Sequence, residues 1–513
     1  MNSGVCCVII FIDLVALCGI FTAFAGRSRH PRLFLMNEAE KKLPIDWKPA
    51  AVLSAAGVII YSILTFYFPY VSSDGFLYLD LAGNLFDKGL VADSEPREKF
   101  LPFYPFLLAV VHIGSGKMLE LSIAAHAVDI ACGALVSSLV FLLAFELGAS
   151  RRTAFLFGFV QLALPLGMDQ YRDVSVLPLF TLQLCLLLFF IKRERLLWAG
   201  IVAGIAVTTR YEAYLFLPFF LLVNLKRPKR LAYSAAGFLP FALFWWVRNL
   251  IKFGNVFHTL YMAELTTRLA FHLDSIGLGL VWEFGPFVLL LGGFGIARLS
   301  GAWKAYIIGF PLLYIALHTT WWFYDNRFLL SLCPFILPVA AVSADAAIKW
   351  TEERKPGKKK ALLVVMIVLV AVPLVSRQAC YFYKLGNAEL GPYRQAAEQL
   401  KKVPASVAFL GSRDHIIEHY SGHRAYTWKL MGDADPHQYV LKHYLEKDVG
   451  MVVWTNTHPL DYQRFPFLRQ GKDFTVMVDL PEGSYSLTYQ YYATFGELPR
   501  IVHVYNVLVK KTE

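Results

Sequence analysis

Long runs of apolar residues, separated by short polar connections, fill the chain up to about residue 376. An apolar run of about 20 residues forms a helix that can cross the roughly 30 Å core of a bilayer. The pattern therefore predicts a polytopic membrane protein with about 11–12 transmembrane helices. The candidate spans are 5–25, 50–70, 119–147, 153–168, 174–191, 196–209, 211–225, 231–248, 279–297, 303–319, 328–348 and 361–376.

The last part of the chain has a different pattern, with shorter apolar runs and more polar residues. Segments 450–454 and 474–478 are predicted to be strands, and segment 436–446 a helix. Strands that alternate with helices are typical of a compact α/β domain. The sequence thus predicts a transmembrane domain at 1–376 and a C-terminal α/β domain at 377–513.

Composition supports the membrane assignment. Hydrophobic residues make up 57% of the chain, aromatic residues 15%, and the mean hydropathy is +0.49, all above the values typical of a soluble domain. The seven cysteines lie mostly in apolar segments and lack metal-ligand spacing. They therefore predict neither a disulfide framework nor a metal centre.

Basic residues are concentrated in alternate connections between the candidate spans. The clearest examples are 192–195 (KRER), 226–230 (KRPKR) and 349–360 (KWTEERKPGKKK). Because Lys and Arg are retained on the cytoplasmic side, these connections are expected inside, and the loop at 71–118 and the C-terminal domain outside. The net charge of +11 then reflects loops lying against anionic membrane lipids, not nucleic-acid binding.

The outer loop begins with a segment that combines a helix start with a candidate catalytic acid. Ser72 or Ser73 can cap a helix that begins at Asp74. At 100° per residue, Asp74 lies on the apolar side of this helix with Tyr78, whereas Asp80 lies on the other side. Asp74 is therefore a candidate functional carboxylate, and the alternative is a first-turn acid that stabilises the helix dipole.

Two apolar hairpins are interrupted by charged residues. Asp169, Arg172 and Asp173 interrupt the first, and Arg210 and Glu212 interrupt the second. Charged groups at this depth persist only in a wet cavity or beside a partner. Two interpretations stay open: structural ion pairs, Arg210 with Glu212 or Arg172 with Asp173, and a cavity that binds an anionic head group.

The stretch 196–225 could form one long helix or two short segments. A single helix would reverse every later connection and move 226–230 outside, so the charge pattern favours two segments. Segments of about 14–15 residues reach only about 21–22 Å. The turn at Arg210 is therefore expected to be recessed into the outer half of the membrane.

Further cations lie at the outer ends of apolar stretches, namely Lys99, Arg248 and Arg327. Each alone could be a membrane anchor whose charge reaches the interface. Together with the acid of the outer loop, they describe an outward-facing site with one candidate base and several phosphate-binding groups. Within a span, His126 and Asp129 are one helical turn apart and could hydrogen-bond to each other.

Several segments, taken in order, resemble membrane glycosyltransferases of the GT-C fold, a group that includes protein O-mannosyltransferases and bacterial aminoarabinose transferases. They are Asp74-Gly-x-x-Tyr78-x-x-x-Ala82, Glu98-Lys99-x-x-Pro102-x-Tyr104, Gly200-x-x-x-Gly204 running to Thr209-Arg210-Tyr211-Glu212, Arg248-Asn249, and Asn326-Arg327-Phe328 before Pro334. The resemblance covers most of residues 50–376.

This resemblance implies a sugar donor carried on a polyprenyl phosphate, an inverting transfer, and Asp74 as the general base. Lys99 and Arg327 match positions that hold the lipid phosphate, and Arg210 would add electrostatic stabilisation. Further pocket candidates are Tyr78, Asp169, Arg172, Asp173, Glu212 and Arg248. Many relatives have a second acid directly after the first, where this chain has Gly75. No metal ligand is therefore assigned, and a divalent metal stays an open alternative.

The expected reaction takes place at the outer face of the cytoplasmic membrane, with a lipid, a glycan or a protein as acceptor. Two other functions remain open: a transporter or flippase for a polyprenyl-phosphate-linked sugar, and a non-catalytic relative that binds the lipid. A long acidic outer loop and a terminal extracytoplasmic domain favour the glycosyltransferase over the transporter.

Overall fold

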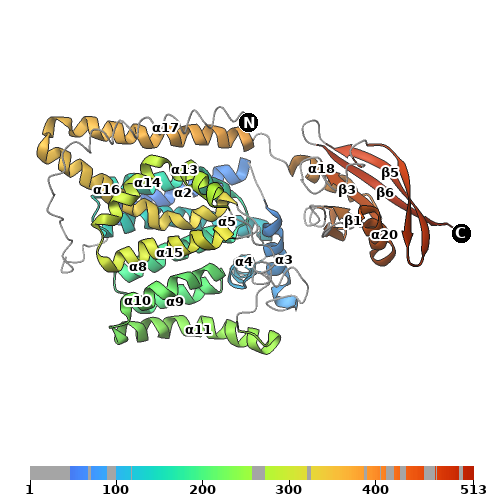
Figure 1. The fold of residues 1–513 in the computed structure, drawn as a ribbon, viewed down its shortest axis with the longest axis horizontal. Helices are drawn as coiled ribbons and strands as arrows, with labels where there is room; N and C mark the ends of the chain where they lie inside the picture. The colour runs from blue at the N-terminus through green and yellow to red at the C-terminus, as the bar shows by residue number, and fades with distance from the viewer. Residues whose placement is uncertain are drawn as a thin grey trace. The chain divides into compact units, whose positions relative to one another are not determined.

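The structure is a computed structural model (Figure 1). It describes residues 47–67, 71–88, 100–116, 118–256, 272–320, 325–385, 390–404, 406–411, 417, 421–427, 435–455, 468, 471–495 and 501–512. The chain divides into two compact units, Met1–Phe382 and Tyr383–Glu513. The candidate span 5–25 lies outside the described residues.

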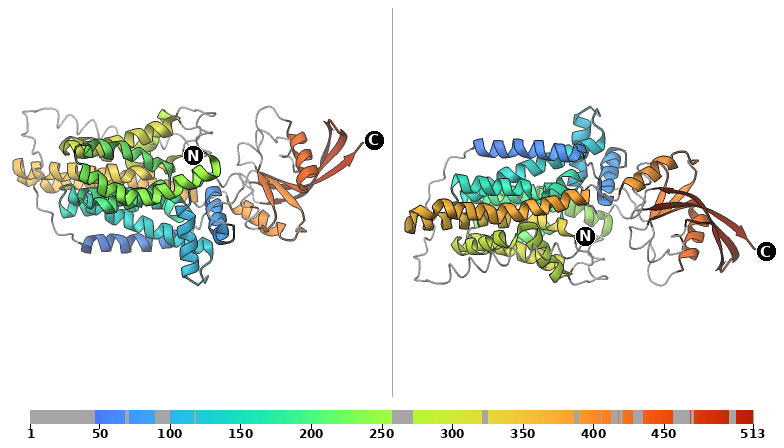
Figure 2. Two further views of the ribbon diagram at one scale, coloured as in Figure 1. Left: turned by 90° about the horizontal axis from the view of Figure 1, so that it is seen from below. Right: turned by 90° about the horizontal axis from the view of Figure 1, so that it is seen from above.

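The described part of the first unit is helical, and Figure 2 shows its long helices running side by side. The α-helices are α2 (Trp47–Tyr67), α3 (Ser73–Lys88), α4 (Phe103–Gly114), α5 (Leu121–Glu146), α6 (Arg151–Ala163), α7 (Pro165–Arg172), α8 (Val176–Lys192), α9 (Leu196–Val207), α10 (Leu217–Asn224), α11 (Pro228–Phe253), α13 (Leu273–Phe284), α14 (Pro286–Arg298), α15 (Gly301–Thr320), α16 (Cys333–Arg354) and α17 (Lys359–Leu385). The 3₁₀ helices are η2 (Tyr211–Phe216), η3 (Asn326–Leu332) and η4 (Pro356–Lys358).

Several of these helices have the length and composition of membrane spans. Among the described residues, four candidate spans meet both criteria, and the number rises to six if each of two bent helix pairs forms one span. Three shorter apolar helices, such as Leu196–Val207, accompany them. The prediction of a polytopic helical membrane protein is confirmed.

One expected span, 279–297, is broken in the structure. Helices α13 and α14 meet at an angle of 96°. Gly285 between them has φ of +80°, a conformation that favours glycine, and Pro286 cannot donate a backbone hydrogen bond to continue the first helix. The bend therefore follows from a Gly-Pro pair inside an apolar run.

Glycines bring α9 and α11 into close contact. A Cβ on Gly200 would lie 2.1 Å from the carbonyl oxygen of Ser234, and a Cβ on Gly204 would lie 2.7 Å from that of Phe238. The contacts advance in the same direction along both helices, so α9 and α11 are parallel. The chain must therefore return between them through η2 and α10, which confirms the two short segments expected in 196–225.

Basic connections that are distant in sequence share one end of the first unit. The Arg193 guanidinium, just after α8, pairs with Glu146 at the end of α5. Arg230, at the start of α11, pairs with Glu194 at 2.6 Å. The ends of α5, α8 and α10 therefore lie together, as the alternation of basic connections requires.

The second unit contains a six-stranded mixed sheet in the order β2-β1-β3-β6-β5-β4. Its elements are α18 (Leu390–Leu400), β1 (Ala408–Gly411), β2 (Ala425–Thr427), α20 (Pro436–Lys447), β3 (Val449–Thr455), β4 (Phe474–Leu480), β5 (Gly483–Phe495) and β6 (Val502–Lys511). Strand β1 pairs in parallel with β2 and β3, whereas the β3–β6, β6–β5 and β5–β4 pairs are antiparallel. Trp454, Tyr489 and Tyr505 are fully buried in its core. The predicted α/β fold is confirmed, although the sequence pattern missed the short strand β2.

Candidate functional site

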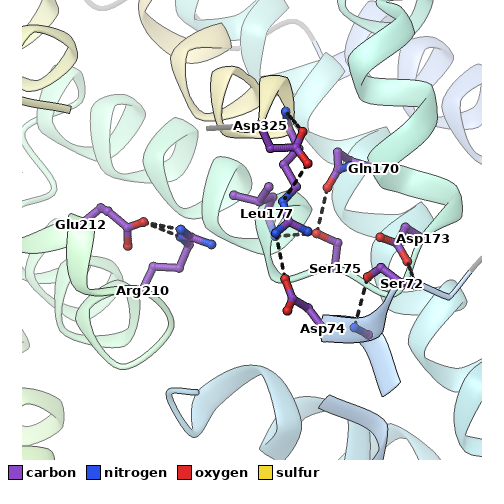
Figure 3. Close-up of polar contacts among 11 residues, drawn as sticks. Ser72, Asp74, Gln170, Asp173, Ser175, Leu177, Arg210, Glu212 and Asp325 are labelled. Carbon is purple, nitrogen blue, oxygen red and sulfur yellow. Dashed lines mark hydrogen bonds and ion pairs between the residues drawn. The ribbon is translucent and has the colours of Figure 1, made fainter. Parts of the chain in front are cut away.

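Ser72, the residue before α3, makes two hydrogen bonds that hold the N-terminus of this helix. The Ser72 Oγ atom accepts a hydrogen bond from the Gly75 N–H at 3.1 Å, which caps the helix. The Ser72 N–H donates to Oδ1 of Asp173 at 2.7 Å. These bonds fix the first turn of α3, which carries Asp74, against the end of α7 (Figure 3).

Gly75 lies directly against the break between α7 and α8. A Cβ at this position would be 2.8 Å from the carbonyl oxygen of Val174 and 3.0 Å from Cγ1 of Val71. A side chain here would force α3 away from the break. The absence of a second acid after Asp74 therefore has a steric cause.

Asp74 forms an ion pair with Arg327, although the two residues are 253 positions apart in sequence. The Arg327 guanidinium donates from Nη2 to Oδ2 of Asp74 at 2.8 Å. The Asp74 side chain is 41% exposed and the Arg327 side chain is 22% exposed, so solvent reaches the pair. The structure thus brings the candidate base and a candidate phosphate-binding group into contact.

Arg327 is oriented by the start of η3. Asp325 caps this helix, because its Oδ1 accepts a hydrogen bond from the Arg327 N–H at 2.9 Å (Figure 3). Its Oδ2 lies 3.7 Å from Nε of Arg327. One carboxylate therefore holds the backbone of Arg327 and also faces its guanidinium.

Arg210 follows α9 at the turn into η2 and pairs with Glu212. Both Nε and Nη2 of Arg210 donate to Oε1 of Glu212, the first at 3.1 Å. The same Glu212 oxygen lies 3.8 Å from Nε2 of His318. Of the two ion pairs left open by the sequence, the Arg210–Glu212 pair is present.

Phe328 connects the two arginines. The guanidinium carbon of Arg327 lies 5.4 Å from the centre of the Phe328 ring, and that of Arg210 lies 5.7 Å from it. The His318 ring also stacks on the Phe328 ring, with 4.4 Å between ring centres. Guanidinium groups near an aromatic ring gain cation–π stabilisation. The ring therefore keeps two cations from distant parts of the sequence in one cluster.

A buried carboxylate supports the break between α7 and α8. Asp129 Oδ2 accepts a hydrogen bond from the Tyr104 hydroxyl at 2.7 Å and one from the Ser175 N–H at 3.1 Å. The Ser175 hydroxyl donates to Gln170 and caps α8. The hydrogen bond that His126 and Asp129 could form is not seen, because Oδ1 of Asp129 and Nδ1 of His126 have no partner among the described residues, and Oδ2 accepts from Tyr104 and Ser175.

Two further candidates, Tyr78 and Arg248, have surroundings other than this cluster. Tyr78 is buried, with its ring 4.6 Å from that of Phe100 and 5.0 Å from that of Tyr104, so it belongs to the core. Arg248 lies on α11, over the Trp245 ring at 4.6 Å. Arg172 is buried in α7. Lys99 and the side chain of Asp169 lie outside the described part of the chain.

Two residues that position the site, Asp325 and Ser175, were not predicted from the sequence. Asp325 caps η3, and Ser175 caps α8. Their positions directly before apolar helices were a detectable signal, since Asp and Ser are preferred caps.

The described residues do not form a metal site. They contain no group of three or more His, Cys, Asp or Glu side chains arranged around a common point. Asp74 is paired with a cation, and Gly75 leaves no space for a second carboxylate. The donor set that divalent cations require is therefore not met by this cluster.

Comparisons with known proteins give similarity at the level of structure. No protein-family model matches the sequence, and no curated protein is significantly similar to it.

Three solved structures illustrate the likeness. The apo structure of ArnT from Cupriavidus metallidurans has a TM-score of 0.58 and 14% identity, and the match covers 88% of this chain and 97% of that one. The structure of the same protein bound to undecaprenyl phosphate has a TM-score of 0.58 and 14% identity, with 90% and 98% covered. The Archaeoglobus fulgidus oligosaccharyltransferase, tethered to an acceptor peptide, has a TM-score of 0.61 and 13% identity, with 88% and 75% covered. Both proteins are GT-C glycosyltransferases, and this chain has the fold that they share.

Proposed function

We propose that this protein is a glycosyltransferase that moves a sugar from a polyprenyl-phosphate donor to an acceptor. The observation that carries the proposal is the contact between Asp74 and Arg327 at 2.8 Å in a partly exposed position. The transfer needs a base for the acceptor hydroxyl and a cation for the leaving phosphate. The Asp74 carboxylate and the Arg327 guanidinium supply these two groups. The GT-C fold and the undecaprenyl phosphate bound to the similar ArnT support the choice of donor.

The chemistry divides between these two groups. The leaving polyprenyl phosphate carries negative charge as the bond to the sugar breaks, and Arg327 neutralises it through charge-assisted hydrogen bonds. The acceptor hydroxyl loses its proton as it attacks, and Asp74 accepts that proton as general base. Attack from the side opposite the phosphate inverts the anomeric centre. Arg210 and Lys99 add positive charge for the phosphate.

The proposed orientation follows from the basic connections. The end of the first unit that holds the Arg193–Glu146 and Arg230–Glu194 pairs faces the cytoplasm in this proposal. The candidate site and the C-terminal domain then lie on the extracytoplasmic side of the cytoplasmic membrane. A reporter fused after Lys358 would be cytoplasmic.

A transporter or flippase for the same lipid is the second candidate, because bent helix pairs such as α13–α14 also occur in transporters. Purified full-length protein in lipid nanodiscs, incubated with polyprenyl-phosphate donors that carry different labelled sugars, separates the two functions. The glycosyltransferase releases free polyprenyl phosphate and labels an acceptor. Intact donors, together with lipid translocation in proteoliposomes, would instead establish the transporter.

A further inference from the structure

We infer that the donor phosphate replaces Asp74 on the guanidinium of Arg327, so that binding of the donor releases the catalytic carboxylate. The inference rests on the function proposed above and adds an order of events to it. Without donor, Asp74 and Arg327 are paired at 2.8 Å. With donor, Arg327 binds the lipid-linked phosphate and Asp74 is free to face the acceptor.

Among the carboxylates around Arg327, Asp74 is the one that can leave without cost to the backbone. Asp325 accepts the Arg327 N–H and caps η3. Asp173 accepts the Ser72 N–H at 2.7 Å and anchors the start of α3. Asp74, by contrast, has its hydrogen bond to the Arg327 side chain. Exchange of this one bond leaves both helix starts intact.

The neighbouring Arg210–Glu212 pair is less suited to the exchange. Two nitrogens of Arg210 donate to Oε1 of Glu212, and the Glu212 side chain is only 13% exposed. Separating that pair would leave a nearly buried carboxylate without its cation, which is strongly unfavourable. The Asp74 side chain is 41% exposed, so water can solvate it after it leaves Arg327. For a phosphate, displacing Asp74 from Arg327 therefore costs less free energy than displacing Glu212 from Arg210.

The position of α3 makes the exchange a local movement. The Ser72 cap and the bond to Asp173 hold the first turn of α3, and Gly75 packs closely on Val174. Rotation of the Asp74 side chain alone is then sufficient. The released carboxylate stays within reach of the sugar that the phosphate carries, so it can accept the proton of an acceptor that attacks from the side opposite the phosphate.

The reaction then balances around the exchanged pair. The acceptor oxygen forms a bond to the anomeric carbon, the bond from that carbon to the phosphate oxygen breaks, and its electron pair stays on the phosphate. The acceptor proton moves to Asp74. Departure of the polyprenyl phosphate and loss of this proton to solvent allow Asp74 to pair with Arg327 again.

The exchange predicts that Asp74 competes with the donor phosphate. Binding of undecaprenyl phosphate to purified full-length protein in nanodiscs measures this directly. Asp74→Asn should tighten binding by about two- to fivefold, the range given by partly exposed ion pairs. Arg327→Gln should weaken binding by about one to two orders of magnitude.

A double-mutant cycle separates competition from simple repulsion between two negative charges. In the Arg327→Gln background, Asp74→Asn should give no further tightening, because no pair is left to break. Equal tightening in both backgrounds would overturn the exchange. An Asp74→Asn variant that binds undecaprenyl phosphate with unchanged affinity would also overturn the exchange.

Two controls complete the test. Arg230→Gln removes an ion pair of 2.6 Å at the opposite end of the unit and should leave binding unchanged. Undecaprenol lacks the phosphate, so its binding should not respond to Asp74→Asn, and a response would overturn the inference. The measurement requires no sugar transfer. Its failure would therefore reject the exchange while the turnover assay still decides the glycosyltransferase.

Discussion

Gly75 and the carbonyl oxygen of Val174 are so close that a Cβ on Gly75 would lie 2.8 Å from that oxygen. The first turn of α3 can lie against the α7–α8 break because this position has no side chain. Asp74 immediately precedes Gly75, so the distance between Asp74 and Arg327 depends on this contact.

Gly75→Ala should therefore impair turnover by moving Asp74, with a loss of about tenfold or more, since small misplacements of catalytic groups are costly. Gly83→Ala is the matched control in the same helix, because its Cβ would meet Leu121 at an ordinary 3.7 Å. Sugar-transfer rates of both variants test this. Equal rates in the two variants would show that α3 adjusts to the added methyl group.

Asp74→Asn should lower turnover by about 10²–10⁴ while binding of the donor persists, because the amide keeps the shape of the carboxylate but does not accept the proton. Single-turnover kinetics with saturating donor provide the measurement. Asp274→Asn is the control: Asp274 is also an acid in the first turn of a helix, α13, and it is exposed. If both variants keep wild-type rates, Asp74 is only a helix-start acid.

Tyr104→Phe should destabilise the first unit, because it removes the 2.7 Å hydrogen bond to the fully buried Asp129. An intramolecular hydrogen bond contributes about 0.5–1.5 kcal/mol to the free energy of unfolding, and a buried acceptor that loses its donor costs about 1–3 kcal/mol. Thermal unfolding in detergent should show a lower midpoint. Tyr67→Phe removes a hydroxyl from an exposed tyrosine and should leave the midpoint unchanged; similar shifts would argue against a special contribution of Asp129.

Gly200→Ala should push α9 away from α11, since its Cβ would lie 2.1 Å from the carbonyl oxygen of Ser234. Overpacking of this kind costs about 1–3 kcal/mol. The midpoint of thermal unfolding should fall relative to Gly277→Ala, whose Cβ would meet no atom within 4 Å. An unchanged midpoint would mean that the two helices separate at little cost.

Acid should destabilise the C-terminal domain through two histidines of α20. Burial lowers the pKa of His437, although Asp435 opposes this shift, and burial likewise lowers the pKa of His443. Each folded-state pKa lies below the unfolded value of about 6.5, so the unfolded domain binds more protons. Stability is then complete above about pH 6.5 and declines as the pH falls through the folded-state values.

Hydrogen exchange of β3 and β6 in the full-length protein, corrected for the intrinsic pH dependence, measures this effect. Protection should be lower at pH 5 than at pH 7.5. The double variant His437→Gln, His443→Gln should lose less protection over the same interval. An identical loss in both proteins would assign the acid sensitivity to other groups.

Features that depend on neighbouring residues were predictable from the sequence. Apolar runs predicted the helices, alternate basic connections predicted one shared end, and the Ser72 cap predicted the start of α3. Strands β3 and β4 were likewise visible as short apolar segments. Local hydrophobicity and capping are set by residues a few positions apart, so one sequence is enough to detect them.

Tertiary structure decided which charged groups meet. Nothing local indicates that Asp74 pairs with Arg327 across 253 positions, or that Asp129 bonds Tyr104 and Ser175 instead of His126. These partners depend on how α5, α7, α8 and η3 pack, because broken helices bring their ends together from distant parts of the chain. The sequence by itself therefore determined the helices and the candidate groups, whereas only their packing determined which of those groups form a site.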